Sequence, residues 1–205
     1  MTVGVQPARS TAAFVAAFVL TGMVTTVLGP ILPELLIAWH LTDAAGGALF
    51  SAQFTGSVTA GLISGLIVAR LGDARTLAIG YALMTVGLLG LAGGSYAWGV
   101  TGACLVGLGM GCVIPPTNLL IARARPERAA AALGGLNFAW GLGASAWPLI
   151  VSSVVPVAGL RPPLVTLALL CGIAAVGIGT RASPVRQHTA AEDQPISLSA
   201  SRILL

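Results

Sequence analysis

Long apolar segments separated by short polar turns make up most of the sequence. A helix needs about 20 predominantly apolar residues to cross the hydrocarbon core of a bilayer, and the segments are close to or above that length. We therefore predict six membrane-spanning helices, at about residues 11–38, 45–69, 76–94, 98–122, 129–155 and 164–180. Residues 1–10 and 181–205 are more polar and are expected to form a short N-terminal tail and a C-terminal tail or linker.

The composition supports this prediction, because hydrophobic residues make up 56% of the chain and charged residues only 8%. Ordinary globular domains contain about 25% charged residues. The formal net charge is +4, but the basic residues lie singly or in short turns between apolar segments. A continuous basic face, as nucleic-acid binding requires, is therefore not expected. The expected partner of this surface is the lipid bilayer.

Arginines mark one side of the predicted membrane protein. Nine of them lie in the N-terminal tail, the second-to-third and fourth-to-fifth turns, and the C-terminal tail, whereas the opposite turns carry only Arg161. Loops rich in basic residues stay in the cytoplasm. We therefore predict a multi-pass protein of the inner membrane with both termini cytoplasmic. The basic turn with Arg123, Arg125 and Arg128 is the clearest marker of that side.

A weak internal repeat divides the six segments into two sets of three. The second segment contains Gln53-Phe54 and the fifth contains Asn137-Phe138, and proline pairs or near-pairs lie late in the first and fourth. Three spans separate each pair, so equivalent helices run in opposite directions, as is typical of secondary transporters. The predicted fold is thus an all-α integral membrane bundle of six helices in two inverted three-helix repeats.

Glycines and prolines are the candidates for helix packing and gating. Gly61 and Gly65 have the GxxxG spacing that lets two helix backbones approach closely. Proline removes a backbone donor and kinks a membrane helix, and neighbouring groups then satisfy the freed carbonyls. The candidates for packing or gating are Gly29, Pro30, Gly61, Gly65, Pro115 and Pro148.

Uncharged polar side chains are the candidates for a solute path, namely Thr25, Gln53, Asn137 and Trp140. An amide in hydrocarbon either bonds across helices or faces a wet cavity, and both interpretations stay open for Gln53 and Asn137. Trp140 either packs or stacks on a ligand. Asn118 is expected to cap the fourth-to-fifth turn, and Glu34 is expected near the membrane interface, hydrated or in a gate.

Enzymatic chemistry is not expected from this sequence. It has no arrangement of paired carboxylates or of Ser, His and Asp that would serve catalysis. Gly107, Gly109 and Gly111 lie inside an apolar segment, and the chain has no lysine that could reach a phosphate, so a nucleotide loop is excluded. Three isolated cysteines indicate neither a disulfide framework nor a metal site. We expect no cofactor and no metal.

The turn after the second segment resembles the loop signature of the major facilitator superfamily. In that signature, glycine is followed after three residues by Asp-Arg, one further residue, glycine and basic residues. Gly65, Arg70, Gly72 and Arg75 match it, whereas Ala69 replaces the usual aspartate. The resemblance implies a carrier that rocks between inward-facing and outward-facing states. The loss of the aspartate puts a cytoplasmic charge cluster of the family in doubt.

The fourth and fifth segments are similar to those of the fucose and glucose/galactose branch of this superfamily. The similarity rests on Gly111-Cys112, Asn118, Asn137-Phe138, Gly141-Leu142-Gly143-Ala144 and Pro148. Proton-linked carriers of that branch have carboxylates at two positions that are Gly29 and Ile114 here. Both positions are therefore apolar, which argues against proton–sugar symport by these residues alone.

The function predicted from these patterns is alternating-access transport of a small neutral or amphipathic solute by a permease. Six spans correspond to one half of such a carrier, so a second six-helix half is expected as a covalent continuation or as a second copy. The sequence ends at Ile203-Leu204-Leu205, which resembles the start of a seventh helix cut short. The alternative is a non-transporting assembly or regulatory protein derived from a permease half.

Overall fold

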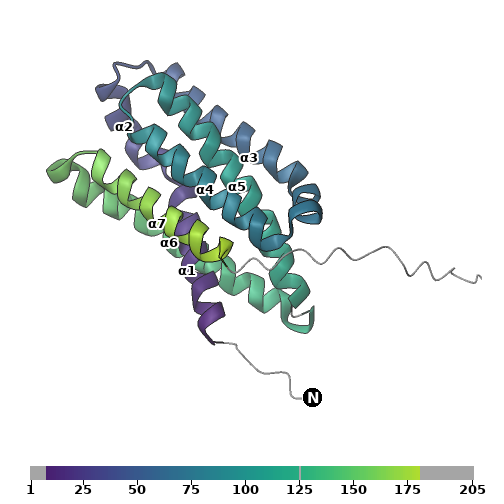
Figure 1. Ribbon diagram of the computed structural model, residues 1–205. Helices are drawn as coiled ribbons and strands as arrows, with labels where there is room; N and C mark the ends of the chain where they lie inside the picture. The colour runs from purple at the N-terminus through teal and green to yellow at the C-terminus, as the bar shows by residue number, and fades with distance from the viewer. Residues whose placement is uncertain (1–7, 125, 181–205) are drawn as a thin grey trace, which may run out of the picture.

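The computed structural model describes residues 8–124 and 126–180, and this part of the chain is almost entirely helical (Figure 1). Its elements are α1 (Ala8–Thr25), α2 (Leu28–Ala38), α3 (Asp43–Leu71), α4 (Asp73–Ala92), α5 (Tyr96–Ala124), the short 3-10 helix η1 (Pro126–Arg128), α6 (Ala129–Ala158) and α7 (Arg161–Gly179). The predicted C-terminal tail, most of the N-terminal tail and Arg125 lie outside the described residues.

Six candidate membrane spans result from these elements, as the sequence predicts. The first span, Phe14–Ala38, combines α1 and α2, and the fifth, Pro126–Ala158, combines η1 and α6. Helices α3, α4, α5 and α7 form the others. Each is long and apolar enough to cross a bilayer. The all-helical, six-span fold class is therefore confirmed.

Helix α5 lies at the centre of the packing. It contacts α3 on one side and α4 on the other, and α4 also packs against α7, while α1 packs against α6 (Figure 1). If the first three spans are exchanged with the last three, the α3–α5 contact maps onto the α6–α1 contact, and the α4–α7 contact maps onto itself. The contact pattern thus follows the predicted inverted repeat. One pair breaks the symmetry, because α1 and α7 make few contacts whereas α4 and α5 make many.

Glycines permit the close contacts. A Cβ atom on Gly107 of α5 would meet the backbone carbonyl of Gln53 on α3, and one on Gly102 or Gly109 would meet carbonyls of α4. On the other side of the bundle, a Cβ on Gly143 of α6 would meet the backbone of α1. Lipid is as apolar as the helices, so association depends on such close van der Waals packing. Glycine is required at these positions because no side chain fits.

The predicted GxxxG pair does not point at a neighbouring helix within the described part of the chain, although the Gly61 backbone lies close to Gly111 of α5. A Cβ on Gly65 would have nothing within 4 Å, and one on Gly61 would meet only Pro115 Cγ at 4.0 Å. Gly56 carries the close approach of α3 instead, since a Cβ there would meet the carbonyl of Cys104 on α5. Gly61 is half-buried at the edge of this contact, and Gly65 is exposed.

The first span is interrupted near its middle. Helix α1 ends at Thr25 and α2 begins at Leu28, with Pro33 inside α2. The hydroxyls of Thr21 and Thr25 donate to the carbonyls four residues earlier, at 2.9 and 2.7 Å. Such bonds bend helices, and the proline ring removes a further backbone donor. We call the segment between Thr25 and Leu28 the kink.

Two side chains from neighbouring helices satisfy carbonyls at the kink. Gln53 Nε2 of α3 donates to the Thr25 carbonyl at 3.3 Å, and Trp147 Nε1 of α6 donates to the Val27 carbonyl at 3.1 Å. Both side chains are only 1% exposed. An unpaired carbonyl in hydrocarbon costs several kcal/mol, so a broken helix needs such donors. Gln53 therefore bonds across helices and does not face an open cavity.

The α3–α5 contact can be tested by adding a side chain to it. We expect Gly107→Val to lower the free energy of unfolding by at least about 2 kcal/mol, because the new Cβ would force the two backbones apart. Gly65→Val is the matched control and should change it by less than about 0.5 kcal/mol, since its Cβ enters open space. Unfolding in mixed micelles, followed by circular dichroism, measures both. Equal effects would contradict the packing described here.

The kink can be tested by removing one donor. Gln53→Leu keeps the apolar packing but leaves the Thr25 carbonyl without its partner, so we expect a loss of about 1–2 kcal/mol of stability. Ser51→Ala on the same helix is the control, because the exposed Ser51 hydroxyl bonds only within α3. The same unfolding measurement applies. A Gln53→Leu variant as stable as the control would show that the kink does not depend on this bond.

Candidate functional site

The candidate path residues lie around the kink, on α1, α3 and α6. Trp140 Nε1 of α6 donates to Thr25 Oγ1 at 3.3 Å, and Gln53 donates to the Thr25 carbonyl from the other side. Thr25 and Trp140 are both half-buried. The structure thus brings together Thr25, Gln53 and Trp140, three of the four residues that the sequence singles out.

Asn137, the fourth candidate, is exposed on α6, about one turn before Trp140. It lies in line with Gly141 and the exposed Pro148 along the same side of the helix. A Cβ on Gly141 would have nothing within 4 Å. We call Asn137, Gly141 and Pro148 the α6 stripe. It carries an amide that offers both donors and an acceptor beside the half-buried indole of Trp140.

The two positions at which the resemblance to sugar carriers implies carboxylates are uncharged here. Gly29 is exposed near the start of α2, and a Cβ there would meet nothing within 4 Å. Ile114 is half-buried on α5, next to the exposed Pro115. Pro30 follows Gly29 and is half-buried in the first turn of α2. The nearest carboxylate on this span is Glu34, which is exposed toward the end of α2.

Asn118 does not cap the fourth-to-fifth turn, which corrects the expectation from the sequence. It lies inside α5, which continues to Ala124. Its Oδ1 atom is buried and has no hydrogen-bond partner among the described residues. The helix simply runs further than the sequence pattern indicates. The buried amide oxygen is therefore an acceptor whose donor lies outside the part of the chain that the structure describes, or an unpaired group.

The loop that matches the family signature joins α3 to α4 with a tight turn at Gly72. Its φ angle is 82°, which side chains rarely adopt, so glycine is required there. Arg70 closes the last turn of α3, and Arg75 lies in the first turn of α4, both exposed. Ala69 is exposed at the position of the usual aspartate and has no charge to offer a neighbour.

Two residues that support the site could not be identified from the sequence. Trp147 is buried and bonds to the kink. Tyr81 of α4 donates its hydroxyl to the Ala17 carbonyl at 2.8 Å and lies 2.9 Å from the Thr21 hydroxyl, so it ties α4 to α1. The feature of the sequence that could have pointed to them is their polar group, because an indole or phenol in the middle of an apolar span needs a hydrogen-bond partner.

Solute binding by hydrogen bonds and aromatic contact is the chemistry that this arrangement offers. Within the residues that the structure describes, no group of three or more His, Cys, Asp or Glu side chains could hold a metal ion. The available groups are the amide of Asn137, the half-buried indole of Trp140 and the hydroxyl of Thr25. They can hold a small molecule but cannot move a proton between carboxylates.

Comparison with known proteins identifies the family. Residues 14–204 match the family model of the Major Facilitator Superfamily. The chain is also similar to the 4-hydroxybenzoate transporter PcaK of Pseudomonas aeruginosa, with 30% identity over 162 residues. That match covers 77% of this chain and 36% of PcaK, so the chain aligns with about a third of this relative's length.

These matches support the superfamily but not the finer resemblance to the fucose and glucose/galactose branch, because PcaK is named for an aromatic acid. The superfamily consists of membrane transporters, which agrees with the expectation that the chain is not an enzyme. The match with the family model extends over nearly the whole sequence and includes all six spans. The chain belongs to the Major Facilitator Superfamily.

Proposed function

We propose that the chain forms one half of a secondary transporter and moves a small neutral or amphipathic solute by alternating access. The observation that carries this proposal is the cluster of uncharged polar groups at the kink. Thr25 and Trp140 are half-buried and bonded to each other, and Asn137 is exposed beside them. Binding sites of such carriers lie near the membrane midplane at discontinuous helices. The kink interrupts the first span near its middle, which supports a site there.

A small aromatic acid is the solute class that these groups favour. The relative PcaK is named as a transporter of 4-hydroxybenzoate, which has an aromatic ring, a hydroxyl and a carboxylate. Trp140 can stack on a ring, and the amide of Asn137 can pair with a hydroxyl or a carboxylate. Among the described residues of the kink and the α6 stripe, none carries a positive charge. A solute carboxylate would therefore take its cationic partner from the second half.

The second half is expected to cover α3 and α6. Both helices expose large apolar side chains, including Phe54 and Leu62 on α3 and Phe138 and Leu142 on α6. Exposed apolar side chains alone do not distinguish a covering helix from lipid. The neighbouring glycines, such as Gly65, favour a helix, because they leave room for another helix to approach closely. We propose that the second half is a covalent continuation or a second copy of this chain.

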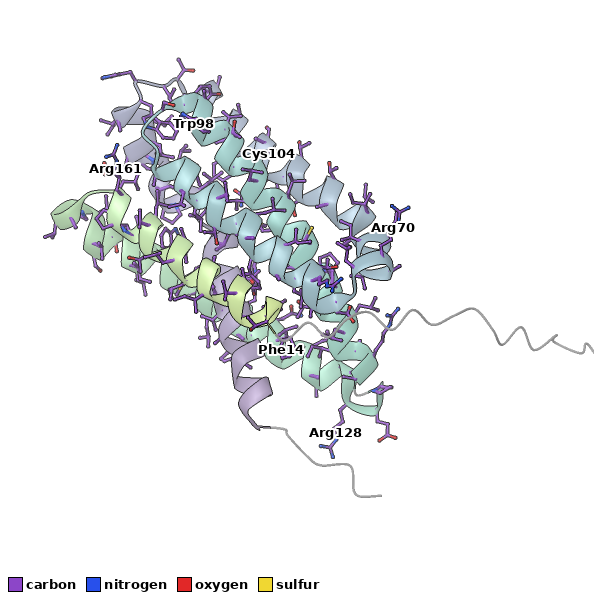
Figure 2. All side chains as sticks on the ribbon, in the orientation of Figure 1. Phe14, Arg70, Trp98, Cys104, Arg128 and Arg161 are labelled. Atoms are coloured by element: carbon purple, nitrogen blue, oxygen red, sulfur yellow. The ribbon has the colours of Figure 1, made fainter. Side chains whose placement is uncertain are left out.

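We also propose that both termini lie in the cytoplasm. Figure 2 shows Arg70 and Arg128 at one end of the bundle and Arg161 at the other. Loops rich in basic residues tend to stay in the cytoplasm, so this distribution supports a cytoplasmic basic end. A fluorescent-protein fusion after Arg128 should fluoresce, because this fusion partner folds in the cytoplasm, whereas a fusion after Leu160 should not. The reverse pattern would invert the proposed orientation. Alkaline phosphatase fusions at the same two positions are the control, with the opposite expected activities.

The transport proposal is tested at Asn137. In a chain whose cysteines are replaced by alanine, we expect Asn137→Cys to react with a water-soluble maleimide, because the α6 stripe would face a wet cavity. Leu142→Cys on the same helix is the matched control, since it is 51% exposed but is expected to face apolar surroundings. Adding 4-hydroxybenzoate should slow the labelling of Asn137→Cys, and uptake of radiolabelled 4-hydroxybenzoate by cells should depend on Trp140.

The possible outcomes separate the competing proposals. If Asn137→Cys reacts with the maleimide but 4-hydroxybenzoate does not slow the reaction, the α6 stripe faces water but the proposed solute class is wrong. Absence of labelling at Asn137→Cys, together with no uptake, would overturn transport and favour a non-transporting assembly or regulatory protein whose faces are packed shut. Gln53→Cys should stay unlabelled in every case, because Gln53 is only 1% exposed.

A further inference from the structure

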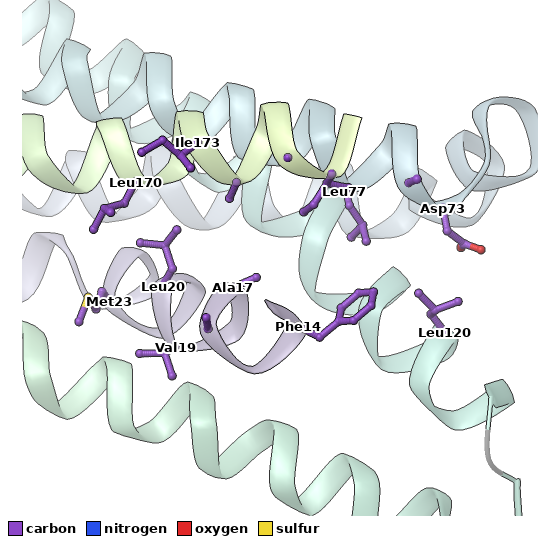
Figure 3. Close-up of a pocket in the computed structure, with 15 residues that line it drawn as sticks. Phe14, Ala17, Val19, Leu20, Met23, Asp73, Leu77, Leu120, Leu170 and Ile173 are labelled. Carbon is purple, nitrogen blue, oxygen red and sulfur yellow. The ribbon is translucent and has the colours of Figure 1, made fainter. Parts of the chain in front are cut away.

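An apolar groove lies between α1, α4 and α7 (Figure 3), and Thr25, Gln53 and Trp140 are not among its lining residues. Its volume is about 680 Å³, and Leu120 of α5 closes one end. The walls are formed by apolar side chains such as Phe14, Ala17, Leu20, Leu77, Leu170 and Ile173. Asp73 is the one charged side chain among its lining residues. The groove therefore offers its occupant van der Waals contact along its length and no hydrogen bond within.

The groove exists because α1 and α7 do not close on each other. The inverted repeat pairs α1 with α7 as it pairs α5 with α4, yet α1 makes few contacts with α7. A Cβ on Gly177 of α7 would meet nothing within 4 Å. Tyr81 holds α1 at Ala17 and Thr21 from the side of α4. The separation of α1 from α7 is thus built into the packing.

The groove lies at the basic end of the bundle. Phe14, which lines it, is near the end that carries Arg70 and Arg128 and far from Arg161 (Figure 2). Two exposed arginines lie close in the sequence to residues that line the groove. Arg75 directly follows Ala74, which lines the groove, and Arg123 lies about one turn beyond Leu120 on α5. Together with Asp73, these arginines leave a net positive charge among the charged residues closest in sequence to the lining.

We propose that this groove binds one acyl chain of an anionic phospholipid from the leaflet at the basic end, with its headgroup near Arg75 and Arg123. The walls belong to membrane-spanning helices, so acyl chains surround them at this depth. An unfilled groove would forfeit contacts along all of its walls. Basic residues at the membrane surface attract anionic lipids, which selects the headgroup. The proposal requires membrane insertion only and does not rest on the proposed transport function.

The test uses the full chain in lipid nanodiscs that contain phosphatidylglycerol with a photoreactive diazirine in its acyl chain. After illumination, peptide mapping by mass spectrometry locates the crosslinks. We expect them to concentrate on the groove-lining residues of α1, α4 and α7. Ala174→Trp fills the groove and should reduce these crosslinks to the level of other lipid-facing surfaces. Leu169→Trp on the same helix is the matched control, because Leu169 is 62% exposed but does not line the groove.

The headgroup is tested with the same diazirine in phosphatidylcholine. We expect phosphatidylglycerol to label the groove more strongly, and Arg123→Gln to reduce this preference about fivefold, the effect of one arginine near a membrane surface. Arg161→Gln at the opposite end should leave the preference unchanged. Thermal unfolding of every variant confirms that it is folded.

Three results would overturn the proposal. The first is even labelling of all exposed helices that Ala174→Trp does not change, which indicates bulk lipid only. The second is weaker labelling of the groove-lining residues than of other lipid-facing surfaces. That result would indicate that a protein segment, and not lipid, occupies the groove. The third is equal labelling by both lipids, which would show that the groove does not select an anionic headgroup.

Discussion

Close backbone contact is the constraint on which the rest of this bundle depends. In a bilayer the hydrophobic effect gives helices little reason to associate, so they must pack closely enough to exclude lipid between them. Gly107 brings α5 against the backbone of Gln53 on α3. The same approach places the Gln53 side chain between Met110 of α5 and the Thr25 carbonyl, at 3.3 Å from both. A packing contact thus delivers the hydrogen bond that stabilises the kink.

The kink explains why the polar residues of the spans have different roles. Gln53 and Trp147 are used to satisfy carbonyls that the broken helix frees, so they are buried and unavailable to a solute. Trp140 also donates to the kink, at Thr25, but its side chain stays half-buried. Asn137 keeps an exposed amide outside this network. A solute that reaches the bundle here would meet Asn137 first and the indole of Trp140 next.

The fold could be predicted from the sequence because span length and hydropathy are properties of a segment by itself. The rotation of each helix about its axis could not, because lipid and protein neighbours are equally apolar and hydropathy does not distinguish them. Gly61 and Gly65 have the expected spacing, yet a Cβ on Gly65 would enter open space and one on Gly61 would meet only Pro115, whereas one on Gly56 would meet the backbone of α5. For the same reason the sequence left Gln53 and Asn137 equivalent, although one is buried and the other exposed.

The broken symmetry of the repeat gives α1 two different neighbours. On one side it packs closely on α6 through Gly143, next to the candidate solute face. On the other side it stays apart from α7, and only Tyr81 of α4 bonds to it there among the described residues. If an acyl chain fills that gap, the lipid and the solute act on the same kinked helix. If the chain rocks as half of a carrier and α1 changes its contacts in doing so, the lipid in the groove would influence the same equilibrium as the solute.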